Sequence, residues 1–319
     1  MNKTVRIGTR ESELAVWQAN KVRQLLHEQN IFSELVFVKS EGDIDLVTPL
    51  YEMGVQGIFT KTLDTALLND RIDIAVHSMK DVPTKIPNGI TKAAILKRGS
   101  YKDLLVFKVK DIINDWKINE QLNEPLLVDG VIATSSIRRK AQWLHRYPNH
   151  TIENLRGNVN TRLKKVNEHN WQGAIFAAAG LERINLRPEN SIELDWMLPA
   201  PAQGAIMVVC RNEDNYCLEA CSKFNDEDTE LCTKIERDFL HELKGGCSTP
   251  ISALAEISAG KIKFSGNICS VDGKEICEFK GEMEMGNSEV NNLGKASALS
   301  ILKNQKAVFI MQQIIDGKK

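Results

Sequence analysis

The feature that most constrains the fold of this chain is an alternation of short apolar runs with helical patterns in its N-terminal part. Val5–Ile7 is followed by an amphipathic pattern over Leu14–Leu26, and Val131–Ala133 is followed by a similar pattern. Repeated strand–helix units favour a mostly parallel sheet covered by helices on both faces. We therefore predict an α/β fold with two such blocks, from 1 to about 99 and from about 104 to 198.

The chain after residue 198 has a different pattern. Leu198–Gly204 contains two prolines and breaks the alternation, and Ala205–Cys210 predicts one more buried strand. The acidic stretch 213–243 predicts helix, as does Asn292–Ile315 near the end. Between them, short turns separate three alternating runs, which are Ile251–Ile257, Lys261–Ile268 and Glu275–Lys280. Such runs favour an antiparallel sheet. We therefore predict a smaller α+β domain at the C-terminal end.

The charges are balanced overall but segregated along the chain. Lys and Arg number 41 and Asp and Glu number 42, which gives a net charge of −1. Residues 131–165 nevertheless carry eight basic side chains and only one acidic side chain, Glu153, whereas 212–242 is strongly acidic. Overall neutrality argues against nucleic-acid or membrane-surface binding. The basic stretch instead favours a local site for an anion.

The seven cysteines all follow residue 209 and form no Cys-x-x-Cys pair. An odd count without an apolar leader pattern favours reduced thiols and a cytoplasmic location. The spacing of cysteines and histidines predicts no metal site. No apolar run reaches the length of a membrane-spanning helix.

Polar and basic residues follow three predicted strands. These segments are Gly8–Ser12, Ala133–Arg139 and Leu155–Arg162. Turns at the carboxyl ends of parallel strands face the ligand crevice, and the planar fork of arginine binds both oxygens of a carboxylate or phosphate. Glycine-rich nucleotide motifs are absent, which favours a small molecule with several carboxylates. The alternative reading is a solvated basic face.

Two further segments carry reactive side chains. Lys80 and Asp81 follow the strand pattern Ile72–Val76, and an ionised carboxylate there could stabilise a cation or move a proton. Asp81 could equally cap a proline-containing turn. Cys247 follows two glycines, which expose a thiol and admit a bulky group. A purely structural thiol in a loop is the alternative.

In combination, these segments resemble the porphobilinogen deaminase family, also called hydroxymethylbilane synthase. The resemblance runs from Arg6 to about Ala255 and is weaker beyond. Each landmark is weak alone, but the ordered set is specific. The landmarks are Ile7–Ser12, Leu14–Ala19, Gly42-Asp43, Asp73–Pro83, Gly130–Arg139, Leu155–Leu163, Ala179–Arg183, Pro201–Ala205 and Gly245–Ile251.

The resemblance implies a chemistry. The family joins four porphobilinogen molecules head to tail, releases ammonia each time, and hydrolyses the product to linear hydroxymethylbilane in haem biosynthesis. The chain grows on a dipyrromethane cofactor held by a thioether, here implied at Cys247. Asp81 matches the catalytic aspartate. The matching cofactor- and substrate-binding positions are Arg10, Ser12, Lys80, Thr134, Ser135, Ser136, Arg138, Arg139, Arg156, Arg162, Arg183 and Gln203.

The resemblance also implies an architecture. Two doubly wound domains like those of type II periplasmic binding proteins would enclose a cleft, and a smaller α+β domain with an antiparallel sheet would carry Cys247. Domain 1 would combine 1–99 with 203–217, domain 2 would cover 103–199, and domain 3 would cover 222–319. Pro199–Gln203 would form part of a hinge, and the protein would be a monomer.

The chain departs from the family pattern at four places. Gly54-Val-Gln-Gly57 lacks a lysine that many members have, and Glu52 stands where a basic residue is frequent. Glu13 replaces a common proline, and Ala202 replaces a common glycine. Because Cys247, Asp81 and the arginines are all retained, we expect an active enzyme.

Two other functions compete with this interpretation. A two-lobed binding protein for a carboxylate-rich solute would have the same cleft, but the Gly-Gly-Cys segment speaks against it. An RNA-binding protein would use the basic stretch 131–165. That stretch has few aromatic residues, and the acidic stretch 212–242 would repel a polyanion.

Overall fold

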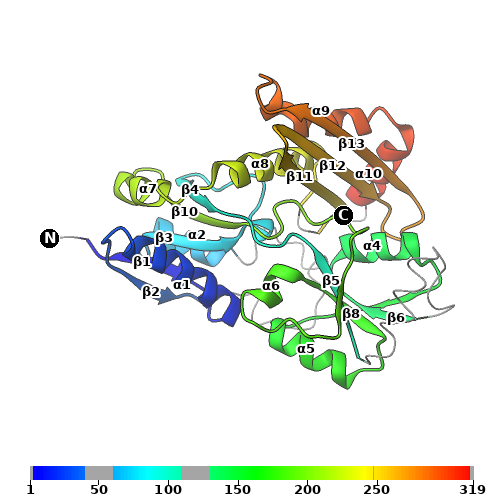
Figure 1. Cartoon of the computed structure of the whole chain (residues 1–319), viewed down its shortest axis with the longest axis horizontal. Coiled ribbons are helices and arrows are strands. Elements are labelled where there is room, and N and C mark those ends of the chain that lie inside the picture. The colour runs from blue at the N-terminus through cyan, green and yellow to red at the C-terminus, as the bar shows by residue number, and fades with distance from the viewer. Residues whose placement is uncertain (1–2, 40–59, 109–129, 247, 317–319) are drawn as a thin grey trace.

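The computed structural model of the chain describes residues 3–39, 60–108, 130–246 and 248–316. The strands of these residues form two five-stranded sheets and one three-stranded sheet (Figure 1). The sequence predicts a surface insertion over the polar, weakly patterned segment Asn114–Asp129. This segment and the departures Glu52 and Gly54–Gly57 lie outside the described residues.

The first sheet has the strand order β2-β1-β3-β10-β4. Its strands are β1 (Val5–Thr9), β2 (Ser33–Phe37), β3 (Ile74–Ser78), β4 (Ile90–Leu96) and β10 (Ile206–Arg211). β1 pairs in parallel with β2 and β3, whereas β10 is antiparallel to both β3 and β4. The sheet is therefore mixed rather than mostly parallel, because the chain returns from the second sheet and inserts β10 between β3 and β4.

Helices cover both faces of this sheet because its strands are apolar on both sides. On β3, Ile74 and Val76 pack with one cluster and Ala75 packs with the other, as the alternation of a strand requires. α1 (Glu13–His27) and α7 (Asn215–Ser222) contribute to the first cluster, and α2 (Lys61–Leu68) contributes to the second. The α/β block expected for the N-terminal part is confirmed.

The second sheet repeats this arrangement, with the order β7-β6-β8-β5-β9. Its strands are β5 (Asp103–Phe107), β6 (Val131–Ala133), β7 (Thr151–Glu153), β8 (Gly173–Ala177) and β9 (Ser191–Glu193). β5 is antiparallel to both neighbours, as β10 is in the first sheet. α4 (Ile137–Arg146) covers one face, and α5 (Val159–Glu168) and α6 (Ala178–Glu182) cover the other.

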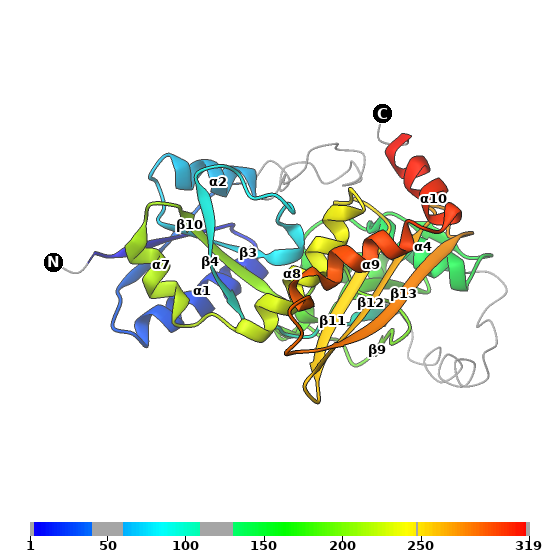
Figure 2. The same ribbon diagram turned by 90° about the horizontal axis from the view of Figure 1, so that it is seen from above.

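The third sheet is antiparallel, as expected, and contains β11 (Ile251–Ser258), β12 (Lys261–Cys269) and β13 (Ile276–Glu284). One apolar core joins it to α8 (Glu227–Glu242), α9 (Leu293–Ile301) and α10 (Gln305–Asp316). Figure 2 shows α8 and α9 crossing the same side of this sheet.

Two predicted helices are each divided in the structure. The acidic stretch forms α7 and α8, because the Asp226 carboxylate accepts a hydrogen bond from Thr229 N and starts a new helix. The expected helix over Asn292–Ile315 forms α9 and α10, since Asn304 accepts from Lys306 N just before α10. Side-chain caps therefore interrupt runs that are helical by composition.

The mixed α/β class with a smaller C-terminal antiparallel sheet is therefore the observed fold. β10 joins the first sheet although it follows the second in sequence, which is compatible with the predicted domain boundaries; the boundaries themselves stay a prediction. Within the described residues, no helix is both long enough and apolar enough to span a membrane.

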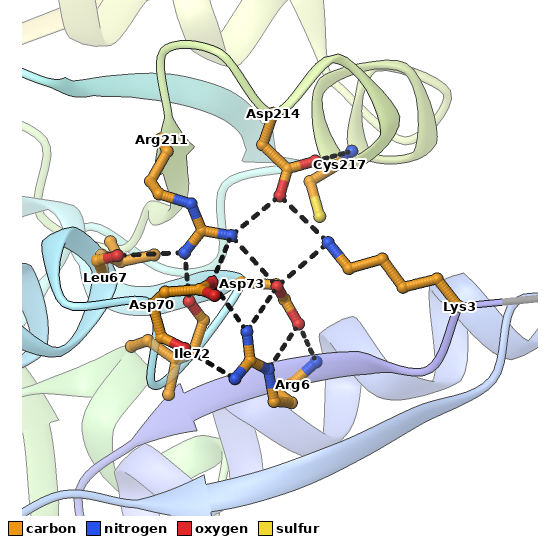
Figure 3. Close-up of polar contacts among 9 residues, drawn as sticks. All are labelled: Lys3, Arg6, Leu67, Asp70, Ile72, Asp73, Arg211, Asp214 and Cys217. Carbon is orange, nitrogen blue, oxygen red and sulfur yellow. Dashed lines mark hydrogen bonds and ion pairs between the residues drawn. The ribbon is translucent and has the colours of Figure 1, made fainter.

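A charged network joins three strands of the first sheet at the end opposite to the Asp81 segment (Figure 3). Asp73, which is fully buried, accepts hydrogen bonds from Arg6 N, Nε and Nη2 and from Arg211 Nη2. Lys3 Nζ lies 3.1 Å from the same carboxylate. Burial alone would raise the pKa of Asp73, but the hydrogen bonds from Arg6 and Lys3 hold this pKa well below its usual range. The network thus ties β1, β3 and β10 together.

Replacing Asp73 by asparagine should lower the free energy of unfolding by about 2–3 kcal/mol. The neutral amide keeps the shape but leaves Arg6 and Arg211 without a buried counter-charge; the cost is limited because both also reach solvent. Denaturant unfolding measures the effect. Asp70→Asn is the matched control, because the Asp70 carboxylate belongs to the same network but is 74% exposed. This substitution should lower the free energy of unfolding by less than about 1 kcal/mol. Equal losses in the two variants would contradict this account.

Candidate active site

The Asp81 side chain stands on a short turn at the carboxyl end of β3. β3 runs directly into a single 3₁₀ turn, Met79–Asp81, whose Val82 N donates to Met79 O. Asp81 is half-buried there. Lys80 Nζ lies 3.4 Å from Gln203 Oε1. Burial lowers the pKa of Lys80 to about 8, and the negative charge of Asp81 opposes this shift.

Arginines of the second sheet lie close to this turn. Burial lowers the pKa of Arg162 to about 10; the positive charges of Arg139 and Arg156 lower it in the same direction, and the charge of Asp81 opposes them. The positive charge of Arg139 likewise lowers the pKa of Lys80. Lys80 and Arg162, which follow strands of the first and the second sheet, are therefore both close enough to Asp81 to interact with its charge. Positive charge is in excess among them, which suits an anionic ligand.

The structure adds Asp103, which sequence analysis did not identify. Its fully buried carboxylate accepts hydrogen bonds from Arg138 Nη2 at 2.7 Å and from Arg139 Nη2 at 2.7 Å. Gln203 Nε2 also donates to it, at 2.9 Å. Burial alone would raise the pKa of Asp103, but the positive charges of Arg138 and Arg139 lower this pKa to about 2. Asp103 is the one acidic residue of the apolar strand β5, and a buried carboxylate needs such a partner.

The hydrogen bonds to Asp103 give Arg138 and Arg139, which are both predicted to bind ligand, a structural role. Arg138 Nη1 donates to Leu198 O at 2.6 Å, and Arg139 Nη1 donates to Ile175 O at 3.0 Å. Both side chains are buried. They therefore hold β5, β8 and the Leu198 segment in place, a role that sequence analysis did not assign to them. Their binding of ligand carboxylates stays a prediction.

The predicted hydroxyl groups shape the turn that follows β6. Ser136 caps α4 and accepts a hydrogen bond from Arg139 N, while Thr134 Oγ1 accepts from Ser136 N. Ser135 Oγ accepts from Leu155 N and so ties this turn to the neighbouring one. Ser12 stands at the N-cap position of α1. Ser12 makes no side-chain capping hydrogen bond, whereas Thr134, Ser135 and Ser136 fix the loops that precede Arg138 and Arg156.

Two chain segments cross side by side between the first two sheets. Gly99 N donates to Gly204 O at 3.0 Å, and Gln203 Nε2 donates to Tyr101 O at 2.7 Å. Arg183 Nη2 donates to Gly204 O at 2.6 Å. Gly204 has φ +88°, and a Cβ on it would lie 2.6 Å from Ser100 O. The crossing is therefore tightly packed.

Ala202, one of the departures from the family pattern, lies in this crossing. Its φ is +62°, in the left-handed region that favours glycine, and its N–H donates to Glu236 Oε2 at 2.6 Å. The conformation explains why a glycine is common at this position. The other described departure, Glu13, accepts a hydrogen bond from Asn160 Nδ2 at 2.8 Å.

Two predicted site residues remain. Arg10 lies close to His77: burial lowers the pKa of His77 to about 4, and the charge of Arg10 contributes. Cys247 lies outside the described residues, although its neighbours are described, and Thr249 Oγ1 donates to Gly246 O at 2.7 Å. The other six cysteines are free and buried. Burial raises the pKa of several of these thiols, that of Cys221 to about 12.

Comparison with known proteins places this chain in a family. Residues 5–219 match the family model described as "Porphobilinogen deaminase, dipyromethane cofactor binding domain", and residues 230–303 match the model for its C-terminal domain. The chain belongs to the porphobilinogen deaminase family. The family resemblance read from the sequence is therefore confirmed.

Individual porphobilinogen deaminases are similar along most of their length. The protein of Syntrophomonas wolfei is 36% identical over 314 residues, which cover 97% of this chain and 99% of that protein. The chloroplastic protein of rice is 39% identical over 285 residues, or 86% of this chain and 76% of its own length. Among solved structures, the VFT2 domain of Bordetella pertussis BvgS matches 71% of this chain and 90% of its own at 9% identity, with a TM-score of 0.41.

Proposed function

We propose that this chain is a hydroxymethylbilane synthase. It condenses four porphobilinogen molecules head to tail, releases ammonia at each step, and hydrolyses the product to linear hydroxymethylbilane for tetrapyrrole synthesis. The observation that carries this proposal is that Lys80 and Arg162, which follow strands of the two different sheets, both interact electrostatically with the carboxylate of Asp81. Membership of the family supplies the substrate class.

The residues around Asp81 fit a dipyrromethane cofactor. Each of its two pyrrole units carries an acetate and a propionate, so the group needs several cations in one place. Arg156 and Arg162 follow β7, Lys80 follows β3, and together they exceed the nearby negative charge. When bound, the group supplies the primer to which substrate units are joined. The residues that would hold it and the growing chain are Arg10, Ser12, Lys80, Thr134, Ser135, Ser136, Arg138, Arg139, Arg156, Arg162, Arg183 and Gln203.

Asp81 acts on the substrate. Loss of ammonia from the aminomethyl group of porphobilinogen leaves a cation that is delocalised onto the pyrrole nitrogen. A carboxylate held close to that N–H stabilises the developing charge, and it can accept the proton that is lost once the new bond has formed.

Cys247 carries the cofactor. The six other cysteines are buried in apolar surroundings, and burial raises the pKa of thiols such as Cys232 and Cys269 to about 12. A thiol in that state is a poor nucleophile. Cys247 follows Gly245 and Gly246 and is the cysteine that matches the family motif.

Intact mass spectrometry of the purified, active protein tests this function. We expect a covalent mass excess equal to two deaminated porphobilinogen units, localised to Cys247 by peptide mapping. Cys247→Ala should lack the excess and be inactive, whereas the matched Cys277→Ala should retain both the excess and the activity. An active wild-type protein with an unmodified Cys247 would refute the proposal. Tight but non-covalent binding of a polycarboxylate without turnover would indicate a binding protein instead.

The setting of the enzyme follows from the same features. We propose a cytoplasmic monomer that binds neither nucleic acid nor membrane. Six buried, reduced thiols suit a reducing compartment. The acidic segment 212–242 would repel a nucleic acid. We further propose three domains, made of 1–99 with 203–217, of 103–199 and of 222–319.

A further inference from the structure

One arginine of α8 binds the backbone of the turn that carries Asp81. Arg237 Nη1 donates to Val82 O at 2.8 Å and lies 3.4 Å from Met79 O. Its Nη2 donates to Pro83 O at 2.5 Å. A single guanidinium thus binds carbonyls on both sides of Asp81.

The turn depends on such a donor. Met79–Asp81 is only one 3₁₀ turn, and a helix this short cannot satisfy the carbonyls at its carboxyl end. Pro83 has no N–H with which to continue the turn. Val82 N donates to Met79 O. The other described hydrogen bonds to the carbonyls of residues 79–83 come from Arg237. Charged, planar donors are among the strongest that a backbone carbonyl can meet.

The helix that provides Arg237 is itself anchored. The neighbouring side chain, Glu236, is fully buried and accepts two hydrogen bonds from Arg98, at 2.6 and 3.2 Å. The same carboxylate accepts from the N–H groups of Ala202 and Ala255. Figure 1 shows α8 between β4 of the first sheet and β11 of the third. Arg237 therefore extends from a fixed support.

The same helix leads to the cysteine. α8 ends at Glu242, and the chain continues through Gly245 to Cys247. Gly245 packs tightly on the helix, because a Cβ on it would lie 2.4 Å from Leu240 Cδ1. The Asp81 turn and Gly245 thus both contact α8.

We propose that Arg237 is a positioning residue for the reaction: it holds the Asp81 turn on α8 and so sets the place of the Asp81 carboxylate. This inference rests on the proposed function of Asp81. Arg237 acts through the backbone of the Asp81 turn, so its loss should affect the chemical step more than binding.

The test compares three holoenzymes: wild type, Arg237→Met and Phe239→Leu. Methionine keeps the length and apolar stem of arginine but donates no hydrogen bond. Phe239→Leu is the control for stability, because this ring is fully buried on the same helix and packs against Phe264 with a centroid distance of 5.2 Å. It should loosen the core without touching the turn. The kcat and KM for porphobilinogen are measured per cofactor-loaded molecule, with loading taken from intact mass, and hydrogen exchange is followed at the Val82 amide.

We expect Arg237→Met to lower kcat by about 10- to 100-fold with KM changed less than about threefold, since a misplaced catalytic group costs rate rather than binding. Exchange at Val82 should accelerate in this variant and not in Phe239→Leu. A kcat within about twofold of wild type, or a fall no larger than that of Phe239→Leu, would overturn the inference while leaving the proposed function intact. Failure of the wild-type protein to consume porphobilinogen would instead overturn the proposed function and this inference with it.

Discussion

Replacement of Asp81 by asparagine is expected to lower kcat by about 10²- to 10⁴-fold, with the fold and cofactor load retained. Asparagine has the size of aspartate but neither its charge nor its ability to accept a proton. It therefore withdraws stabilisation from the cation formed when ammonia leaves. The half-buried Asp81 carries a negative charge that acts on both Lys80 and Arg162, so its replacement also removes an opposite charge from these two cations.

Turnover of porphobilinogen, circular dichroism and intact mass together check this result. Asp228→Asn is the matched control, because Asp228 is an exposed residue in the first turn of α8 and its loss changes the net charge equally. It should keep wild-type kcat. Turnover of Asp81→Asn within about tenfold of wild type, in fully loaded protein, would remove Asp81 from the mechanism.

Replacement of Asp103 by asparagine should lower the free energy of unfolding by about 3–5 kcal/mol, since it leaves two buried guanidiniums without their partner. Arg138 and Arg139 are both nearly inaccessible to solvent and share this one carboxylate. Activity should fall as well, because Gln203 and Arg139, both predicted to bind ligand, are positioned by the same group. Thermal and denaturant unfolding measure the change in stability.

The pH dependence of this effect has a defined direction. The folded-state pKa of Asp103, about 2, lies below that of an unfolded aspartate, about 3.9. Its contribution to stability is therefore fully present above about pH 4 and is lost as pH falls through about 2. The difference in melting temperature between wild type and Asp103→Asn should shrink over that window. Asp195→Asn, which removes the 76% exposed partner of Lys102, should cost less than about 1 kcal/mol; a similar loss in both variants would contradict the account.

Much of the architecture could be predicted from local patterns. Strands β3, β6 and β7 end shortly before Lys80, Thr134 and Arg156, so the loops that carry Lys80, Asp81 and the arginines lie at strand ends, as the sequence predicts. The antiparallel direction of β10 was not predicted, because the residue pattern of a strand does not show whether it pairs in parallel or antiparallel. Its partners, β3 and β4, are distant in sequence. The divisions between α7 and α8 and between α9 and α10 were also missed, since a single capping residue made each of them.

The sequence by itself determined the α/β class and the family, and it supplied the side chains that we propose carry the chemistry, because periodicity and motif order are properties of neighbouring residues. Only the tertiary structure decided which charges pair. Asp103 meets Arg138 and Arg139, and Arg237 meets the Asp81 turn, across long stretches of chain. The physical reason is burial: a charge removed from water must be matched by whichever partner the packing brings to it. The basic residues that looked like one ligand-binding set thus divide into arginines held by Asp103 and cations gathered around Asp81.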